Sequence, residues 1–298
     1  MSAIPGTVDR AVRPEVTAFF DEPTNTVSYV VKDPNSSACA VIDSVMDLDY
    51  AAGRLTSQSA DRIIDHIRRH DLSLEWLIET HVHADHLSAA PYIQEKLGGR
   101  VGIGEKIRIV QNTFGKIFNA GTDFQRDGSQ FDHLFEDGDR FAIGMIEAYA
   151  MHTPGHTPAC MTYVIGDAAF IGDTLFMPDY GTARADFPGG DARELYRSIQ
   201  KVLSLPADTR LFLCHDYKAP GRDFFAWETT VAAEREGNVH VRAGVSEDEF
   251  VAMRTARDRK LGAPRLIIPS IQVNMNAGHF PPPDRDGNVY LKVPLNRI

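Results

Sequence analysis

The chain has 298 residues, of which 43% are hydrophobic and 24% are charged, so it can bury a full core and does not have the composition of a disordered protein. Its formal net charge of −10 argues against nucleic acid or an anionic membrane as the main partner. Cys39, Cys160 and Cys214 form no C-x-x-C pair, which excludes a disulfide framework and a thiolate zinc knuckle. Residues 1–10 contain no apolar segment and no run approaches about 18 apolar residues, so we expect a cytoplasmic protein without a membrane span.

Strand and helix patterns follow one another from residue 16 onward. Runs rich in Val, Ile, Thr and aromatic residues predict strands over residues 16–20, 26–32, 38–42, 74–79, 101–103, 161–165, 168–171 and 211–213, with a further strand–turn–strand pattern over 140–152. Apolar residues at helical spacing predict helices over residues 58–70, 88–97, 107–118, 192–203 and 246–260. Neither repeats nor a low-complexity linker interrupts the chain. We therefore expect one domain over residues 1–298, with residues 240–298 as a C-terminal extension that packs on it.

Residues 80–86, which read Thr-His-Val-His-Ala-Asp-His, concentrate groups that bind metal ions directly after a predicted strand. In an extended segment His81 and His83 point to the same side, so both can reach one ion. Asp85 and His86, after the chain turns, are placed to face a neighbouring position. Imidazole nitrogen and carboxylate oxygen suit zinc, iron or manganese. The segment therefore predicts a metal site at the edge of a sheet.

Three later segments supply further ligand-type residues, again close to predicted strand ends. His156 lies in Thr-Pro-Gly-His-Thr, Asp173 lies in Gly-Asp-Thr, and His215 follows the strand at 211–213. Asp43 comes directly after the strand at 38–42. A carboxylate there could orient a ligand histidine, but we expect it to cap the next turn.

The order and spacing of these segments resemble the metallo-β-lactamase superfamily, and the resemblance extends from about residue 16 to His215. It implies an α/β fold, a four-layer αββα sandwich of two mixed β-sheets flanked by helices, with the site at one sheet edge. It also implies that His81, His83 and His156 form one metal position. Asp85, His86 and His215 would form a second, and Asp173 would bridge the two.

Further segments resemble the bacterial type of the persulfide dioxygenase, or sulfur dioxygenase, branch of this superfamily. These are residues 181–190, residues 215–218, which read His-Asp-Tyr-Lys, and residues 269–274 with 277–278. Such enzymes oxidise glutathione persulfide with O2 and water to sulfite and glutathione. The resemblance implies one Fe(II) per chain, held by His81, His156 and Asp173. The other four ligand-type residues would hydrogen-bond to ligands or waters; these are His83, Asp85, His86 and His215.

The same resemblance assigns the binding of glutathione to Arg184, Tyr217 and Lys218. Arginine and lysine would supply the positive charge that two substrate carboxylates require. In the mitochondrial type the arginine stands at a different offset, so Arg184 could instead brace its loop through an ion pair with Asp186. Lys218 could equally be a surface charge. We expect no catalytic residue beyond the metal centre, and neither Cys160 nor Cys214 is predicted to be catalytic.

Two other functions stay open at this point. A bridged pair of zinc, iron or manganese ions in the same ligands would make hydroxide available for hydrolysis, as in a glutathione thioesterase of the glyoxalase II kind or a lactonase. A sensor or binding module that has kept the metal and lost turnover is the third reading. The partners expected for the enzyme are a small thiol or persulfide and O2. A homodimer is compatible with the resemblance, although the periodicity shows no interface.

Overall fold

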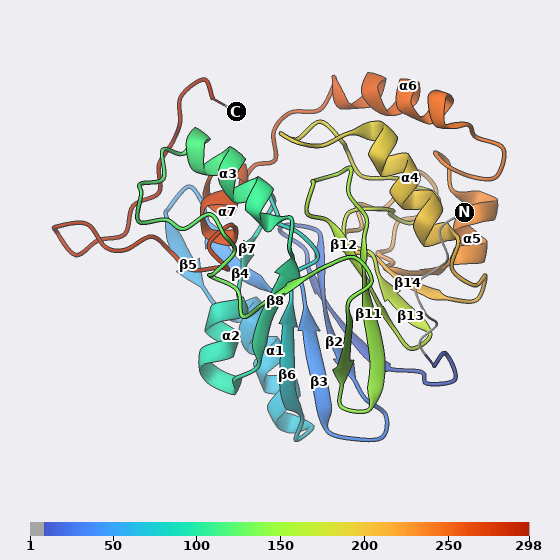
Figure 1. The fold of residues 1–298 in the computed structure, drawn as a ribbon, viewed down its shortest axis with the longest axis horizontal. Helices are drawn as coiled ribbons and strands as arrows, with labels where there is room; N and C mark the ends of the chain where they lie inside the picture. Colours follow the sequence, from blue (N-terminus) through green and yellow to red (C-terminus); the bar gives the residue numbers. More distant parts are fainter. Residues whose placement is uncertain (1–8, 298) are drawn as a thin grey trace.

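The computed structural model describes residues 9–297 and contains two six-stranded sheets that pack face to face (Figure 1). Residues 1–8, which form most of the segment that was expected to contain no apolar run, lie outside the described residues. The first sheet has the order β1-β2-β3-β6-β8-β9. Its strands are β1 (Glu15–Asp21), β2 (Thr26–Lys32), β3 (Ala38–Ile42), β6 (Ser73–Ile78), β8 (Arg100–Gly104) and β9 (His133–Phe135).

The second sheet runs in sequence order from β10 to β15. Its strands are β10 (Arg140–Ile143), β11 (Ile146–His152), β12 (Met161–Ile165), β13 (Ala168–Phe170), β14 (Arg210–Phe212) and β15 (Glu228–Thr230). A small sheet of order β5-β4-β7 lies beside the first one. It consists of β4 (Val45–Asp49), β5 (Arg54–Thr56) and β7 (Leu87–Ser88).

Both large sheets are mixed, and this pairing places the ends of several strands at the same edge. In the first sheet β3 pairs with β6 in parallel, and β6 pairs with β8 in parallel. In the second sheet β13 pairs with β14 in parallel, whereas the other pairings are antiparallel. Parallel neighbours end at the same edge, so the segments that follow β3 and β6, and those that follow β13 and β14, start side by side.

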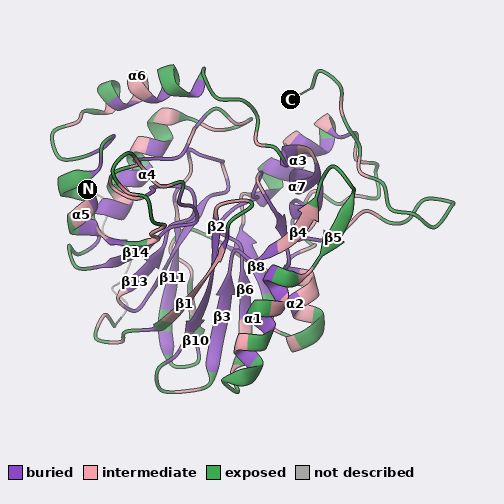
Figure 2. Cartoon of the chain, turned by 180° about the vertical axis from the view of Figure 1, so that it is seen from behind, coloured by how far each residue is buried: buried purple, intermediate pink, exposed green. Residues whose placement is uncertain are grey.

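Helices cover the outer face of each sheet. One side carries α1 (Gln58–Arg69), α2 (Ala90–Leu97), α3 (Ile107–Ile117) and α7 (Ile267–Asn274), and the other carries α4 (Ala192–Leu203), α5 (Val231–Gly237) and α6 (Glu247–Asp258) (Figure 1). The strands between them are mostly buried, whereas the helices have exposed outer faces (Figure 2). The predicted four-layer sandwich is confirmed.

Alternating side chains of the strands divide the core into separate layers. In β2, Val27, Tyr29 and Val31 join the core between the two sheets, whereas Val30 belongs to the core under the helices. This follows from the two-residue period of a strand, which sends successive side chains to opposite faces. A third core lies between the second sheet and α4, with Leu195 and Ile199 fully buried there.

The predicted strands and helices agree with the structure, apart from elements that the sequence pattern did not indicate. These are β4 with β5, β7, β9, β15 with α5, and α7 in the C-terminal segment. The short helix α7 was missed because buried residues lie on all of its sides, so its sequence has no amphipathic pattern. Its Ile267 and Ile271 pack into the core under the first sheet. The assignment of residues 1–298 to one domain with an extension from residue 240 stays a prediction. In the part of the chain that the structure describes, no helix is long and apolar enough to cross a membrane.

Candidate metal centre

The ligand-type residues gather where strands of both large sheets end. They follow β6 (His81, His83, Asp85 and His86), β11 (His156), β13 (Asp173) and β14 (His215). An isolated antiparallel bridge between Thr26 and His215 joins the two sheets at this point, and the backbone N–H of Val27 donates to the carbonyl of Cys214. Four segments that are distant in the sequence therefore meet in one place.

His81, His156 and Asp173 form a compact group at this meeting point. All three side chains are buried, and their ligand atoms lie within 4.8 Å of one another. The Oδ2 atom of Asp173 lies 3.5 Å from Nε2 of His156 and 4.0 Å from Nε2 of His81. Two imidazoles and one carboxylate bind one side of a metal ion and leave its other positions free for substrates.

The other oxygen of Asp173 faces the remaining ligand-type residues. Its Oδ1 atom lies 3.4 Å from Nε2 of His215, and that nitrogen lies 3.6 Å from Oδ2 of Asp85. His83, Asp85 and His86 form a second group whose ligand atoms also lie within 4.8 Å of one another. Asp173 thus directs Oδ2 toward His156 and His81 and Oδ1 toward His215, as a bridging carboxylate would.

Two glycines let the ligand segments pass close to other elements. Gly155, which precedes His156, has a φ of 131°, and a Cβ atom there would collide with the backbone of Leu195 in α4. Gly172, which precedes Asp173, has a φ of 50°, and its Cβ would lie 2.7 Å from Oγ1 of Thr80. Only glycine fits these positions without strain, so the placement of both ligands depends on it.

Asp43 fixes the orientation of the first two histidines. Nε2 of His83 lies 3.0 Å from Oδ1 of Asp43, which makes Nε2 the protonated nitrogen and leaves Nδ1 directed inward. Thr80 donates from Oγ1 to the same carboxylate at 2.8 Å, and Nδ1 of His81 lies 3.0 Å from that hydroxyl. The expectation that Asp43 caps a turn was wrong. The parallel pairing of β3 with β6 instead carries its side chain into the histidine segment.

The other histidines are held in the same way by one ring nitrogen each. Nδ1 of His156 donates to the carbonyl of Arg184 at 2.8 Å, and Nδ1 of His215 donates to that of Asn25 at 3.1 Å. Nδ1 of His86 lies 3.1 Å from Oδ2 of Asp85. Hydrogen bonds of this kind fix ring orientation and tautomer in metal sites, and they leave the opposite nitrogen available to the ion.

The atoms that point into the centre fit a metal ion. Nε2 of His81, Nδ1 of His83, Nε2 of His86 and Oδ1 of Asp173 are buried without a hydrogen-bond partner among residues 9–297. Unpaired buried polar atoms are costly, and an unpaired cluster of nitrogen and oxygen donors requires an explanation. A divalent ion would satisfy them, and this donor set suits iron, zinc or manganese.

The surroundings of His81, His156 and Asp85 shift their pKa values toward the protonation states that bind a metal ion. Burial, together with the neighbouring imidazoles, holds the pKa of His81 well below its usual value, and burial also lowers the pKa of His156. Both rings are therefore neutral at pH 7, which is the form that binds a metal. Burial opposes the charged form of Asp85, but His215 and His86 hold the pKa of that carboxyl well below its usual range.

The two cysteines beside the ligands are buried and protonated. Burial raises the pKa of the Cys160 thiol to about 12, and burial also raises the pKa of the Cys214 thiol. A thiol in this state is a poor nucleophile, and the absence of a catalytic role for either cysteine stays a prediction. The Sγ atom of Cys214 nevertheless lies within 4.8 Å of ligand atoms of His83 and His215, a proximity that sequence analysis did not anticipate.

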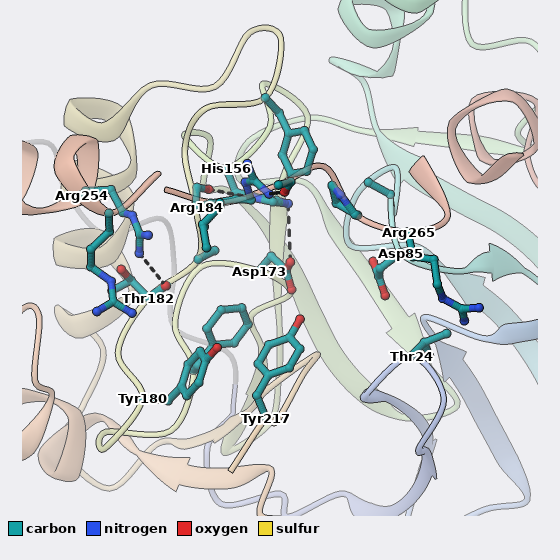
Figure 3. A pocket seen from close by; sticks show the side chains of 18 of the residues that line it. Thr24, Asp85, His156, Asp173, Tyr180, Thr182, Arg184, Tyr217, Arg254 and Arg265 are labelled. Carbon is teal, nitrogen blue, oxygen red and sulfur yellow. Dashed lines mark hydrogen bonds and ion pairs between the residues drawn. The ribbon is translucent and has the colours of Figure 1, made fainter. Parts of the chain in front are cut away.

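A cavity of about 340 Å³ opens onto His156 and Asp173 (Figure 3). Tyr217 lines this cavity, and its ring stacks on His215 with centroids 5.7 Å apart. Tyr180 lines the same wall at 5.2 Å from the ring of Tyr217. The cavity is thus bounded by His156 and Asp173 at its base and by aromatic rings at one side.

Arg184 and Lys218, the two basic residues predicted to bind substrate, differ in their position relative to the cavity. Arg184 lines the cavity, but its guanidinium forms a two-point ion pair with Asp186, at 2.5 and 2.7 Å, and donates to the carbonyl of Gly262. This is the loop-bracing role that the sequence left open. Lys218 is not among the residues that line the cavity, and its ammonium group lies 4.5 Å from the ring centroid of Phe225.

The C-terminal segment contributes residues to the site that sequence analysis did not assign. The Asn274 side chain, in α7, donates to the carbonyls of His83 and His86 at 2.9 and 2.8 Å, and it accepts from the backbone of Ser88. These bonds hold the histidine segment from behind. Three arginines of the same segment line the cavity, namely Arg254, Arg257 and Arg265. Residues 269–274 had been singled out only by resemblance, and no motif marks the arginines.

Comparison with known proteins agrees with this architecture. The chain is 57% identical to a probable metallo-hydrolase of Burkholderia pseudomallei, over 95% of this chain and 99% of that protein. It is 44% identical to glyoxylase B2 of Dictyostelium discoideum, over 95% and 98% of the two chains. The crystal structure of ETHE1 from Myxococcus xanthus matches with a TM-score of 0.71 and 27% identity, over 89% of this chain and all of the other. The human protein of that name, mitochondrial persulfide dioxygenase ETHE1, is 28% identical over 87% of each chain.

Other relatives are longer than this protein. The chain spans about two thirds of the length of three β-lactamase hydrolase-like proteins to which it is 49% to 51% identical. The model of the metallo-β-lactamase superfamily matches residues 21–215, which include every ligand-type residue described above. The chain therefore belongs to the metallo-β-lactamase superfamily.

Proposed function

We propose that this protein is a persulfide dioxygenase that uses one Fe(II) per chain and oxidises glutathione persulfide. The observation that carries the proposal is the grouping of His81, His156 and Asp173, because two histidines and one carboxylate are typical of non-haem iron oxygenases. Among residues 9–297, the three-histidine set of His81, His83 and His156 is not brought within the same 4.8 Å. The likeness to ETHE1 supports the same branch.

His81, His156 and Asp173 would hold the iron, which when bound supplies electrons and open positions for O2 and a sulfur anion. The chain's own part is positioning. Thr80 and the carbonyl of Arg184 keep the two imidazoles turned toward the centre, through contacts at 3.0 and 2.8 Å. The cavity beside them admits a small molecule, and the aromatic rings of Tyr180 and Tyr217 line one of its walls.

The proposed reaction balances with O2 as the oxidant. Glutathione persulfide, O2 and one water give glutathione, sulfite and two protons. The terminal sulfur is oxidised from the persulfide to the sulfite level, its bond to the glutathione sulfur breaks, and that sulfur leaves as the thiol. Asp85 lines the cavity and is held in its ionised form by His215 and His86, so it can hydrogen-bond to the water that enters the reaction.

Product analysis tests this proposal directly. Purified protein loaded with Fe(II) would be given glutathione persulfide in air-saturated buffer, and oxygen consumption and sulfite would be measured together. We expect one sulfite for each O2 consumed, and no reaction with a thioester of glutathione. Sulfite formation without oxygen consumption, or rapid release of thiol from the thioester, would contradict the proposal.

A dinuclear hydrolase is the second candidate, and a specific feature favours it. Asp173 presents Oδ2 to His156 and Oδ1 to His215, at 3.5 and 3.4 Å, which is the placement of a carboxylate between two metal ions. The relatives named metallo-hydrolase and glyoxylase B2 point the same way. A metal pair lowers the pKa of a shared water and would favour thioester hydrolysis. The thioester control in the experiment above distinguishes the two functions.

A further inference from the structure

Two arginines in the cavity wall lack the partners that their neighbours have. Of the four arginines that line the cavity, Arg184 pairs with Asp186, and Arg254 pairs with Asp258 at 2.6 Å. Arg257 and Arg265 are exposed. Within residues 9–297 their guanidinium groups form no ion pair. They therefore add two positive charges without an ion-pair partner to the cavity that His156 and Asp173 line, in a protein whose net charge is −10.

The positive charge of Arg257 affects the pKa values of Arg254 and Tyr180, which line one wall of the cavity. Burial lowers the pKa of the Arg254 guanidinium, the pairing with Asp258 opposes this, and the positive charge of Arg257 lowers it again. Burial raises the pKa of Tyr180, and the charge of Arg257 works against that rise. Two like charges in one wall repel each other, and a bound anion would relieve the repulsion.

Arg265 stands on another side of the same cavity. In Figure 3 it lies beside Asp85 and Thr24, whereas Arg254 lies beside Thr182, to whose carbonyl it donates at 3.1 Å. The metal ligands His156 and Asp173 lie between these two sides (Figure 3). The charge of Arg257 acts on Arg254 and Tyr180, which places Arg257 on the side of Arg254, so the two unpaired charges lie on opposite sides of His156 and Asp173.

We propose that Arg257 and Arg265 form a two-sided carboxylate clamp, which positions a substrate whose sulfur lies between two terminal carboxylates. The inference rests on the proposed function and assigns its specificity to the C-terminal segment. Glutathione has this chemistry, because its glutamyl and glycyl carboxylates lie at opposite ends with the cysteine sulfur in the middle. Arginine suits the task, since its planar guanidinium binds a carboxylate through two hydrogen bonds. A persulfide with a single carboxylate could engage only one side.

The clamp supplies the positive charge for substrate carboxylates that Arg184 and Lys218 do not provide. Arg184 already uses its donors on Asp186 and Gly262, and Lys218 lies outside the cavity lining. Neither residue leaves a positive charge inside the cavity for a substrate carboxylate. The loop after α6 instead brings Arg265 to the cavity from one side, while Arg257 projects from the last turn of α6 itself.

A binding experiment tests the clamp without relying on turnover. The probe is S-methylglutathione, which has both carboxylates but no persulfide or thioester to react, and its dissociation constant would be measured by calorimetry on the metal-loaded protein. The variants are Arg257→Ala, Arg265→Ala and the double substitution. The matched control is Lys260→Ala, because Lys260 is an exposed cation of the same segment that does not line the cavity. We expect each arginine substitution to weaken binding by about 10-fold or more, and the control to leave it unchanged.

Modified ligands make the assignment specific. The dimethyl ester of the probe should bind the unaltered protein weakly and should be indifferent to either substitution. A probe with only the glycyl carboxylate converted to an amide should become indifferent to one arginine substitution while remaining sensitive to the other. Arg257→Lys should recover part of the binding, since the charge returns without the two-point geometry.

The binding and turnover measurements separate the clamp from the proposed dioxygenase activity. Equal affinity of the diacid for the unaltered protein and the double variant, or equally tight binding of the diester, would overturn the clamp and leave both arginines as surface charges. Weakened binding together with no oxygen-dependent turnover would support the clamp and contradict the dioxygenase. If turnover of glutathione persulfide is present, the substitutions should raise KM by about 10-fold or more and change kcat by less than about threefold.

Discussion

Nε2 of His83 lies 3.0 Å from the carboxylate of Asp43, and this contact fixes Nδ1 as the ring nitrogen that points toward the metal centre. Asp43 has a φ of 51°, in a region that few residues other than glycine adopt and that aspartate tolerates better than most. Burial opposes the charge on His83, but Asp43 raises the pKa of that ring well above its usual value. Strain and a buried charge are thus both tolerated at one position, as is common where a side chain supports a functional site.

Replacing Asp43 by Asn tests this support. The substitution keeps the shape but removes the charge that holds His83 and Thr80, so we expect metal affinity to fall by about 10- to 100-fold in competition with a chelator. Asp33→Asn is a matched control, because Asp33 is equally buried and accepts hydrogen bonds from a turn remote from the centre. If both variants lose the same amount of affinity, the effect is one of general stability and not of His83 orientation.

Asp173 is expected to be indispensable for the metal. Asp173→Ala removes one of the three ligands of the proposed iron position, and iron content and activity should disappear together. His86→Ala is the informative companion, because His86 lies outside the group of His81, His156 and Asp173 and should leave close to full iron content. Iron measured by plasma emission spectroscopy in both purified variants decides the question. Full iron in Asp173→Ala would refute its role as a ligand.

Gly155→Ala should both destabilise the protein and disturb the centre. The positive φ costs a residue with a Cβ about 1–3 kcal/mol, and the collision with Leu195 would displace His156. Gly244→Ala isolates the two contributions, since Gly244 also has a positive φ, 97°, but its Cβ would meet nothing within 4 Å. We expect Gly155→Ala to lose more stability than Gly244→Ala in urea unfolding, because the collision adds to the backbone cost, and we expect a loss of iron affinity in Gly155→Ala alone. Equal iron affinity in the two variants would count against the collision.

Stability should depend on pH through His240, which is buried beside Thr182. Burial, with Arg257 and Arg254, lowers the pKa of His240 to about 4, whereas the unfolded chain has the ordinary value near 6.5. The unfolded state therefore binds more protons below pH 6.5, and the free energy of unfolding falls as the pH falls toward 4. From pH 6.5 to 5 this contribution is about 1.5 kcal/mol.

His240→Asn provides the comparison for that titration. The Asn carbonyl can replace Nδ1 as the acceptor for the backbone N–H of Thr182, a bond of 3.1 Å, without gaining a proton in this range. Urea unfolding of both proteins at pH 6.5 and pH 5 should show that the variant loses less stability on acidification. Identical losses would show that His240 does not titrate as described.

The sequence was sufficient to predict the fold, because strands and helices have local patterns, and the residues proposed as ligands could be named from the same kind of pattern. His81, His83, Asp85 and His86 are close neighbours, and the remaining ligands each follow a recognisable strand. The partners of those ligands could not be found in this way. Asp43 reaches His83 only through the parallel register of β3 with β6, and Asn274 reaches the histidine segment across about 190 residues of chain. Arg257 and Arg265 enter the cavity through tertiary packing, and no local signal distinguishes them from surface arginines.

The central claim is a single iron used for oxygen chemistry, and one measurement addresses it most directly. Protein purified without oxygen would be analysed for metal content, and the same sample would then receive glutathione persulfide and a known amount of O2. The account predicts about one iron per chain and oxygen consumption that requires the persulfide. About two metal ions per chain, no oxygen uptake, and release of thiol from a glutathione thioester would contradict it and establish the hydrolase instead.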